Sequence, residues 1–288
     1  MATPDLVLEP AAAASPAPRS RHWYRTPSLV AGAVIIGLVL FGAVFAPLLG
    51  RYDPTQQNLY AILAPPSGAH LLGTDQLGRD VWSRLLYGAR IDLLVAFLAV
   101  LSPFVIGCVL GSIAGYYGGW FDTVVMRLVD VFVAFPFYVL IIALVFVLGP
   151  GPRSIFIAIT AVSWISYARI IRAEILVAKR QDYVAAARGA GLSDLRVVVR
   201  HLLPNVITQA IVFAMSDIVN DILAIVTLGY LGLGIPPPTP DWGSMIYDGQ
   251  TLITTHPLIS TIPGIAVVFV GLGLSLLADG LSHVLRPA

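Results

Sequence analysis

The chain has 288 residues, of which 57% are hydrophobic and 11% charged, and its mean hydropathy is +0.85. These proportions exclude an ordinary water-soluble domain and predict a membrane protein. The formal net charge of +1 gives no reason to expect a nucleic-acid partner, and the single cysteine, Cys108, excludes an intramolecular disulfide. The lipid bilayer is therefore the first expected partner.

The first region, residues 1–28, is rich in alanine and proline and carries little apolar mass. It is expected to be a disordered cytoplasmic tail. Arg19, Arg21 and Arg25 precede the first apolar run, as basic residues do in a signal peptide. That run is longer than the apolar part of a typical signal peptide and starts near residue 29, which favours a retained membrane anchor.

Six apolar segments are long enough to cross a bilayer, which takes about 20 residues each. Hydrocarbon cannot satisfy loose backbone groups, so the spans must be helices, and the alternating strands of a barrel are missing. The expected fold class is an all-α membrane protein with six transmembrane helices. The segments centre on residues 29–49, 93–114, 131–148, 155–175, 207–233 and 258–278.

These segments suggest a simple organisation. The third and fourth are joined by Gly149-Pro-Gly-Pro152, a short turn that predicts an antiparallel hairpin. After the tail, residues 29–92 are expected to form the first transmembrane helix and an external loop. Residues 93–288 are expected to form a core of five helices that includes a polar loop at 180–204.

Two of the expected external loops have distinctive patterns. Consecutive prolines between residues 236 and 240 remove backbone donors and clash, so this run predicts a rigid loop, with Trp242 after it as an anchor at the membrane interface. In the other loop acids alternate with arginines, which favours an ion-pair network that seats the second span; a contact surface for a partner is the alternative. The alternating residues are Asp75, Arg79, Asp80 and Arg84.

The cationic residues set the expected orientation. Residues 169–200 contain seven Lys and Arg side chains against three acids, whereas residues 235–257 contain no Lys or Arg. The positive-inside rule therefore places the N-terminus and residues 180–204 in the cytoplasm. With six spans the C-terminus returns to the same side. The loop at 51–90 then lies outside, where its arginines are balanced by aspartates.

Residues 180–204 form a polar, basic segment that predicts two short helices with a hinge. Asp182 is a suitable N-cap, and Gly191 suits a left-handed stop. Ser193 is expected to cap the second helix and Pro204 to end it. A helix with an alanine surface fits into a groove of another protein. The expected docking residues are Asp182, Tyr183, Ala185, Ala186, Ala187, Arg188 and Gly191, with Leu203 and Pro204 at the end of the loop.

Three polar residues, Asp217, Asn220 and Asp221, lie within the fifth span. An ionisable residue inside a membrane is costly and usually faces a cavity or a partner. Asp217 and Asp221 are one helical turn apart and share a face. They are candidates for the lining of a translocation path that contacts a substrate amine, or for buried contacts with a partner. Arg127 and Asp130 are expected to form a structural ion pair.

The sequence contains no catalytic constellation. A Walker A loop needs Gly-Lys-Ser/Thr to hold phosphates, and the single lysine, Lys179, follows Ala178. The five histidines are not paired at helical spacing, so metal ligation is not expected. The chain is therefore expected to be non-catalytic and to bind no cofactor of its own.

Several motifs together resemble a known family over roughly residues 28–288. The resemblance is to the C-type permease subunit of dipeptide, oligopeptide and nickel ABC importers. One departure is Ala185, which stands where the family has a glutamate. The matching residues are Gly73-Thr-Asp-Gln-Leu-Gly-Arg-Asp80, Ser83-Arg84, Tyr87-Gly-Ala-Arg90, Ala114-Gly-Tyr-Tyr-Gly-Gly-Trp120, Arg127 with Asp130, Ala134-Phe-Pro136, Ala186-Ala187, Gly191, Leu203-Pro204 and Leu231-Gly-Leu-Gly-Ile-Pro-Pro-Pro-Thr-Pro-Asp-Trp-Gly243.

The resemblance implies a type I ABC importer permease fold in which the loop at 180–204 carries the coupling helix. It implies a heterodimer with a second homologous permease, two ABC ATPase subunits or domains that hold ATP and Mg, and an extracytoplasmic substrate-binding protein. It also implies a multi-pass protein of a prokaryotic plasma (inner) membrane that imports di- or oligopeptides. Nickel or another small solute is the alternative substrate, and a secondary transporter is the alternative class.

Overall fold

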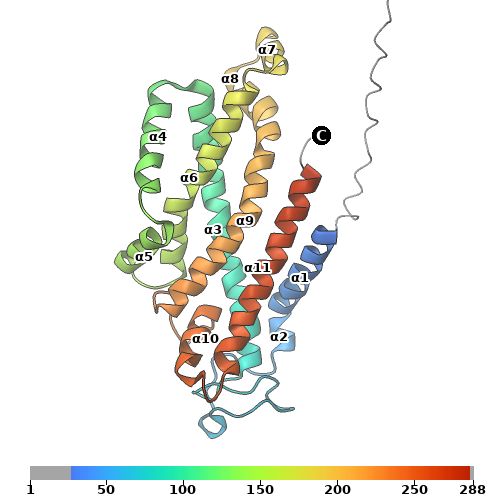
Figure 1. Ribbon diagram of the computed structural model, residues 1–288, viewed down its shortest axis with the longest axis vertical. Helices are drawn as coiled ribbons and strands as arrows, with labels where there is room; N and C mark the ends of the chain where they lie inside the picture. The colour runs from blue at the N-terminus through green and yellow to red at the C-terminus, as the bar shows by residue number, and fades with distance from the viewer. Residues whose placement is uncertain (1–26, 286–288) are drawn as a thin grey trace, which may run out of the picture.

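The computed structural model describes residues 27–285, and its regular elements within that range are helices (Figure 1). Five are long and apolar enough to cross a membrane, and a bent pair supplies a sixth if it counts as one span. The predicted class, an all-α membrane protein, is confirmed. The tail predicted at 1–28 lies outside the described residues, except for the last two, which begin α1. The five are α1 (Pro27–Val44), α3 (Val81–Tyr117), α6 (Pro152–Ala178), α9 (Leu203–Tyr230) and α11 (Leu258–Leu285).

Helices α3 and α6 run side by side through the molecule, and α9 packs against both. Gly107 and Gly111, one turn apart on α3, allow the close approach of α6. A Cβ atom on Gly111 would lie 2.5 Å from the carbonyl oxygen of Ala168. Small residues at this spacing let the backbones of membrane helices come together. Helix α11 packs on α9, and α1 covers α11 on its other side.

The third predicted span is wrong as a single helix. The chain forms α4 (Gly119–Val133) and α5 (Phe137–Leu148), which are bent by 91° relative to each other. Pro136 causes the break, because the residue before a proline is biased away from helical geometry. Helix α5 has 12 residues, a length of about 18 Å, which is too short to cross the hydrocarbon core. The hairpin turn at 149–152 is present between α5 and α6.

Helix α3 begins earlier than the hydropathy of the sequence predicts. The carboxylate of Asp80 caps its first turn by accepting a hydrogen bond of 2.8 Å from the backbone N–H of Ser83. Residues 81–92 therefore belong to the helix and not to the external loop, and the predicted boundary at 92/93 falls inside α3. This first part of α3 packs against protein at the loop end of the bundle, so it can contain polar residues. Because of these residues, the hydropathy of the sequence does not mark it as part of a span.

The polar loop at 180–204 contains α7 (Asp182–Gly189) and α8 (Asp194–Val197), as expected for two short helices. The prediction that Pro204 ends the second helix is wrong. A π-helical turn, η3 (Val198–Leu202), follows α8, and the N–H of Leu203 bonds to the carbonyl of Val198. This wider turn accommodates the missing N–H of Pro204, which lies in the first turn of α9.

Shorter elements complete the fold at the opposite end from α7. They are α2 (Ala46–Leu49), η2 (Leu59–Ala61), α10 (Trp242–Gly249) and η4 (Gln250–Leu252). Helix α10 was not predicted, and it packs on α9 and α11. At the end of the bundle that carries α7, buried side chains form a cluster that we call the inner core. It includes Tyr167, Ile171, Ile175, Val184, Val197, Leu202 and Val206.

Candidate functional site

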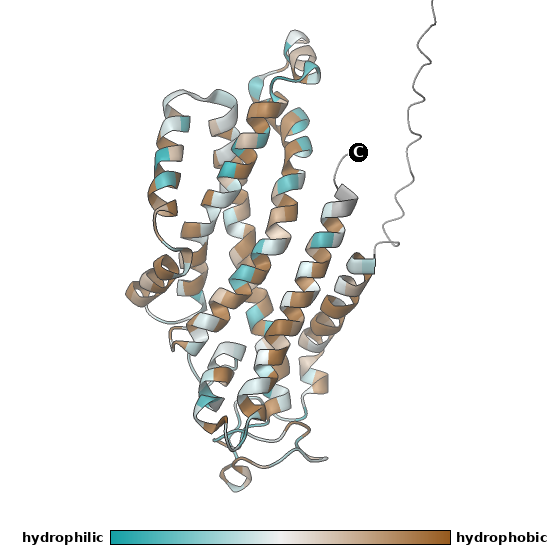
Figure 2. Ribbon diagram, viewed as in Figure 1, coloured by the Kyte–Doolittle hydropathy of each residue, from teal (hydrophilic) through white to brown (hydrophobic). Residues whose placement is uncertain are grey.

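Helix α7 projects from the end of the bundle opposite the long loop between α1 and α3 (Figure 1). Hydrophilic residues gather there, whereas hydrophobic residues dominate the long helices (Figure 2). One face of α7 is exposed, with Tyr183 40% exposed. Val184 and Ala187 point the other way into the inner core. Ala187 is therefore a packing residue rather than part of an exposed docking face. The exposed residues are Asp182, Tyr183, Ala185, Ala186 and Arg188.

Helix α7, which is predicted to lie in the cytoplasm, is attached to the end of α3 by side-chain contacts. The guanidinium of Arg188 lies 4.9 Å from the centre of the Tyr116 ring, a cation–π contact. Arg188 Nε also donates to the Tyr116 hydroxyl at 3.3 Å. That hydroxyl donates in turn to Asp194 at the start of α8, at 2.5 Å. The Tyr116 side chain thus links α3, α7 and α8. Through these contacts, a displacement of α7 would displace α3 and α8 as well.

Gly191 has the predicted left-handed conformation, with a φ of +77°. It turns the chain between α7 and α8, while Leu192 donates its N–H back to the carbonyl of Ala187. The predicted N-cap of α7 is wrong by one residue, because Gln181 occupies that position and Asp182 is the first helical residue. Ser193 holds the N-cap position of α8, as expected, without a capping bond from its side chain.

Three of the four alternating charged residues, Asp75, Arg79 and Arg84, form the predicted ion-pair network, whereas Asp80 contacts His70 Nδ1 at 2.9 Å. Arg79 Nε contacts Asp75 at 2.6 Å, and its Nη2 contacts Asp248 of α10 at 2.9 Å. Arg84 lies 3.5 Å and 3.7 Å from the same two carboxylates. Both arginines are nearly fully buried. Asp248, which the sequence did not single out, carries the network across to α10. The network therefore fixes the loop and the start of α3 against the α9–α11 connection.

Trp242 is not an anchor at the membrane interface, because it is only 1% exposed. Its backbone N–H donates to Asp92 Oδ2 at 3.0 Å, and its indole N–H donates to the carbonyl of Leu85, also at 3.0 Å. The side chain packs beside Gly88, where an added Cβ atom would lie only 3.2 Å from the indole ring. Trp242 therefore joins α10 to α3 among buried residues at this end of the bundle. A tryptophan after a proline-rich loop gives no sequence signal that separates these two roles.

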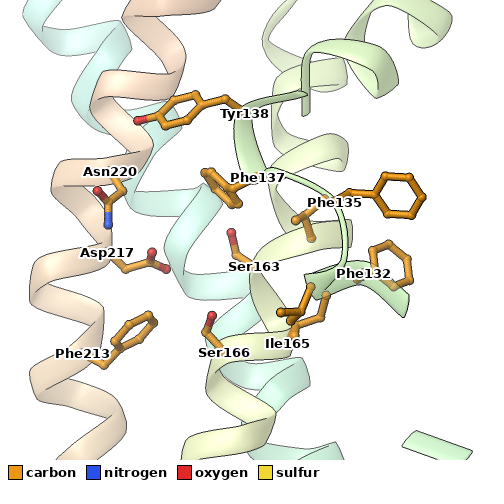
Figure 3. A pocket seen from close by; sticks show the side chains of 12 residues that line it. Phe132, Phe135, Phe137, Tyr138, Ser163, Ile165, Ser166, Phe213, Asp217 and Asn220 are labelled. Atoms are coloured by element: carbon orange, nitrogen blue, oxygen red, sulfur yellow. The ribbon is translucent and has the colours of Figure 1, made fainter. Parts of the chain in front are cut away.

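A cavity of about 400 Å³ lies between α5, α6 and α9, beside the break that follows α4. Figure 3 shows Asp217 and Asn220 directed toward it from α9 and Ser163 facing them from α6. Aromatic side chains form much of the wall, which leaves a polar patch on an apolar surface. The aromatic residues are Phe132, Phe135, Phe137, Tyr138 and Phe213.

The two carboxylates of α9 have different surroundings. The hydroxyl of Tyr167 donates to Asp217 Oδ2 at 2.8 Å, and Asp217 lines the cavity. Asp221 does not line it. It is fully buried, and neither of its oxygens has a hydrogen-bond partner among residues 27–285. The three polar residues predicted on the fifth span are thus divided, with Asp217 and Asn220 at the cavity and Asp221 within the bundle.

The ion pair expected between Arg127 and Asp130 is not formed, as both side chains are exposed and neither has an ion-pair partner within the described part of the chain. The ion pair of α4 lies one turn earlier. Asp122 accepts two hydrogen bonds from Arg172 of α6, one of them 2.6 Å long. This paired fork joins α4 to α6 near the cytoplasm-predicted end. The i, i+3 spacing of Arg127 and Asp130 could not show that the ion pair of α4 is made by a different residue, with an arginine on another helix.

The fold and these features define a multi-pass membrane protein with a short helix exposed at one end and a polar cavity within the bundle. Residues 107–288 match the family model of the binding-protein-dependent transport system inner membrane component. Residues 21–66 match the N-terminal transmembrane domain of oligopeptide transport permease C. The first match covers more than half of the chain. The protein belongs to the inner membrane permease family of binding-protein-dependent ABC importers.

Relatives cover nearly the whole chain. It is 39% identical over 262 residues to the dipeptide transport system permease protein DppC of Haemophilus influenzae, covering 89% of each chain. It is 37% identical over 256 residues to the oligopeptide transport system permease protein OppC of Bacillus subtilis, covering 89% of this chain and 84% of that one. An inward-facing MetNI methionine ABC transporter structure shares the fold, with a TM-score of 0.56 and 19% identity over 70% of this chain and 97% of that chain.

Proposed function

We propose that this permease forms half of the pore of an importer for di- and oligopeptides in the plasma (inner) membrane of a prokaryote. The other half would be a second homologous permease, giving a heterodimer. Two ABC ATPase subunits or domains would bind ATP and Mg, and an extracytoplasmic binding protein would deliver the peptide. The chain itself would bind no nucleotide and catalyse no reaction. The peptide substrate is supported by the dipeptide and oligopeptide permeases among its relatives.

The observation that carries the proposal is the exposed face of α7. This face carries Asp182, Tyr183, Ala185 and Ala186. The opposite face of α7 packs into the inner core through Val184 and Ala187. Small exposed side chains let a partner's backbone approach closely, which suits a groove in an ATPase subunit. When ATP closes the ATPase pair, α7 would move, and the Arg188–Tyr116–Asp194 contacts would pass the motion to α3 and α9.

The same proposal assigns the cavity beside Asp217 and Asn220 to the translocation path, with Asp221 supporting it from within the bundle. It assigns the buried ion pairs of Asp75, Arg79 and Arg84 to holding the outer loops in shape around the outer mouth. Substrate therefore passes between an outer end that is fixed and an inner end that is coupled to ATP hydrolysis.

Replacement of Ala186 by aspartate tests the coupling role. A bulky charge in a closing groove is opposed by desolvation, which costs more for an unpaired carboxylate than the roughly 1–3 kcal/mol of an uncharged polar group. Cells expressing the variant with its partner subunits are expected to hold normal amounts of the permease in the membrane and to lose peptide uptake. Gln57→Asp, an exposed position in the loop at the other end, is the matched control and keeps uptake. Normal uptake by the Ala186→Asp variant would remove the coupling assignment.

Cysteine labelling tests the orientation. The proposal places both termini and residues 180–204 in the cytoplasm, because the cationic excess lies there. A cysteine at the exposed Ser193 should react with a membrane-impermeant maleimide only after the cells are opened. A cysteine at Gln57 should react in intact cells. The reverse pattern would invert the topology.

A further inference from the structure

A second cavity, of about 530 Å³, adjoins the first one. It lies on the cytoplasm-predicted side of it and contains two arginines, Arg169 and Arg172. Ser166 and Phe213 line both cavities, so the two spaces meet at these side chains. The combined passage follows α6 along one wall, and it is large enough to hold a small peptide.

Each end of this passage carries a charged side chain that has no ion-pair partner among the described residues, and the two charges are opposite. At one end Asp217 accepts a single hydrogen bond, from Tyr167, and has no ion-pair partner among residues 27–285. At the other end Arg172 is held by Asp122, whereas Arg169 is exposed and has no ion pair in the same range. An unpaired charge within a membrane-spanning region usually serves a ligand or a partner.

We infer that the passage recognises short peptides with free termini, binding the ammonium group at Asp217 and the carboxylate at Arg169. This inference rests on the proposed function and deepens it by assigning the residues that bind the two ends of the peptide. Asp217 lies level with Ser163 in Figure 3. Ser163 and Arg169 are six residues apart on α6, a rise of about 9 Å. An extended dipeptide spans about 7 Å and a tripeptide about 10 Å.

The chemistry of the passage fits both groups. A carboxylate with one oxygen held by Tyr167 leaves the other free to accept from an ammonium group, and Asn220 adds a further polar atom nearby. A guanidinium forms paired hydrogen bonds with a carboxylate. Between the charges the wall is apolar and aromatic, with Phe213 shared by both cavities, so it places few demands on the peptide side chains. Selection by the termini and tolerance of the side chains follow from this arrangement.

A photoreactive dipeptide tests the inference directly. Alanyl-p-benzoylphenylalanine is incubated with the purified complex of the permease and its co-purifying subunits, in nanodiscs and without binding protein, and labelling of this chain is measured. N-acetylation of the probe and Asp217→Asn are each expected to lower labelling about tenfold, the loss expected for one charge-assisted contact. C-amidation and Arg169→Gln are expected to do the same. Arg127→Gln removes an exposed arginine that lines neither cavity and should leave labelling unchanged.

Combinations of probe and variant decide the outcome, as in a double-mutant cycle. N-acetylation should cost nothing further in Asp217→Asn, and C-amidation nothing further in Arg169→Gln, whereas the crossed combinations should multiply. Losses that multiply in every combination, or wild-type labelling in both variants, would overturn the inference. So would failure of Asp217→Asn to assemble, because Asp217 would then be a packing residue. ATP-dependent uptake of dialanine by the wild-type complex with its binding protein tests the proposed function separately.

Discussion

The two ends of the molecule use their charged and polar residues differently. At the end predicted to face outward, which we call the outer end, Arg79 and Arg84 are buried against Asp75 and Asp248 and pair with these carboxylates. At the end predicted to be cytoplasmic, which we call the inner end, the face of α7 that carries Asp182 is exposed, and Asp182 has no such partner among the described residues. Charges that pair within the chain stabilise its fold. An ordered helix with one buried face and one exposed face can instead bind another protein through the exposed face.

This contrast explains why sequence reasoning succeeded unevenly. Long apolar helices such as α1, α6 and α11 were predictable because about 20 apolar residues have few alternatives to a membrane span. Gly191 was predictable because a left-handed turn is a local property of the backbone. The break at Pro136 had a local signal too, since proline restricts the residue before it, but the apolar run across it concealed the bend.

Other features could not be predicted because they depend on distant residues. Arg79 pairs with Asp248, 169 residues away, and only the fold brings them together. Trp242 is buried because α3 lies against it, and α10 is too short to stand out from the loop around it. For the candidate site, the sequence identified Asp217 and Asn220 but could not separate them from Asp221, nor find the neighbouring Arg169, because side-chain direction on two packed helices decides which residues face a cavity.

The largest effect on the comparison is expected from Arg79→Ala, which breaks the outer network. It leaves two carboxylates with a lost partner in a largely buried site, at a cost of about 3–5 kcal/mol. The variant is expected to accumulate poorly in the membrane and to unfold at a lower temperature in detergent. Arg51→Ala, at an exposed residue of the same loop, should be close to wild type. Equal stability of the two variants would show that the outer end is not held by its ion pairs.

Gly191→Val is expected to lower stability less than Arg79→Ala does, but to abolish peptide uptake. A Cβ at this position meets no neighbour within 4 Å, so only the backbone strain at a φ of +77° opposes it, about 1–2 kcal/mol. The strain would turn α7 away from its docking position. Membrane levels should stay near normal while peptide uptake is lost. Gly191→Asn, which tolerates the left-handed conformation, should retain uptake; loss in both variants would point to a requirement other than backbone shape.

The smallest effect is expected from Asp241→Asn at the outer end. Burial raises the pKa of the Asp241 carboxyl above its ordinary value, although hydrogen bonds from Ser244 oppose the change. A raised folded-state pKa means that the stabilisation is present below the unfolded pKa of about 3.9 and is lost as pH rises through the folded pKa. The amide keeps the cap and does not ionise. The melting temperature of the variant relative to wild type should therefore increase between pH 4 and pH 7, and a decrease would contradict this environment for Asp241.

Crosslinking at two neighbouring positions tests whether α7 is the element through which ATP hydrolysis reaches the pore. Cysteine is introduced at Ala186 on the exposed face or at Ala187 on the buried one; the native Cys108 is buried. The complex is treated with a short maleimide–amine crosslinker. If α7 docks on an ATPase, a crosslink forms from position 186, and not from 187, to a co-purifying subunit that hydrolyses ATP. Absence of that crosslink at position 186, in a complex that imports peptide, would contradict this docking.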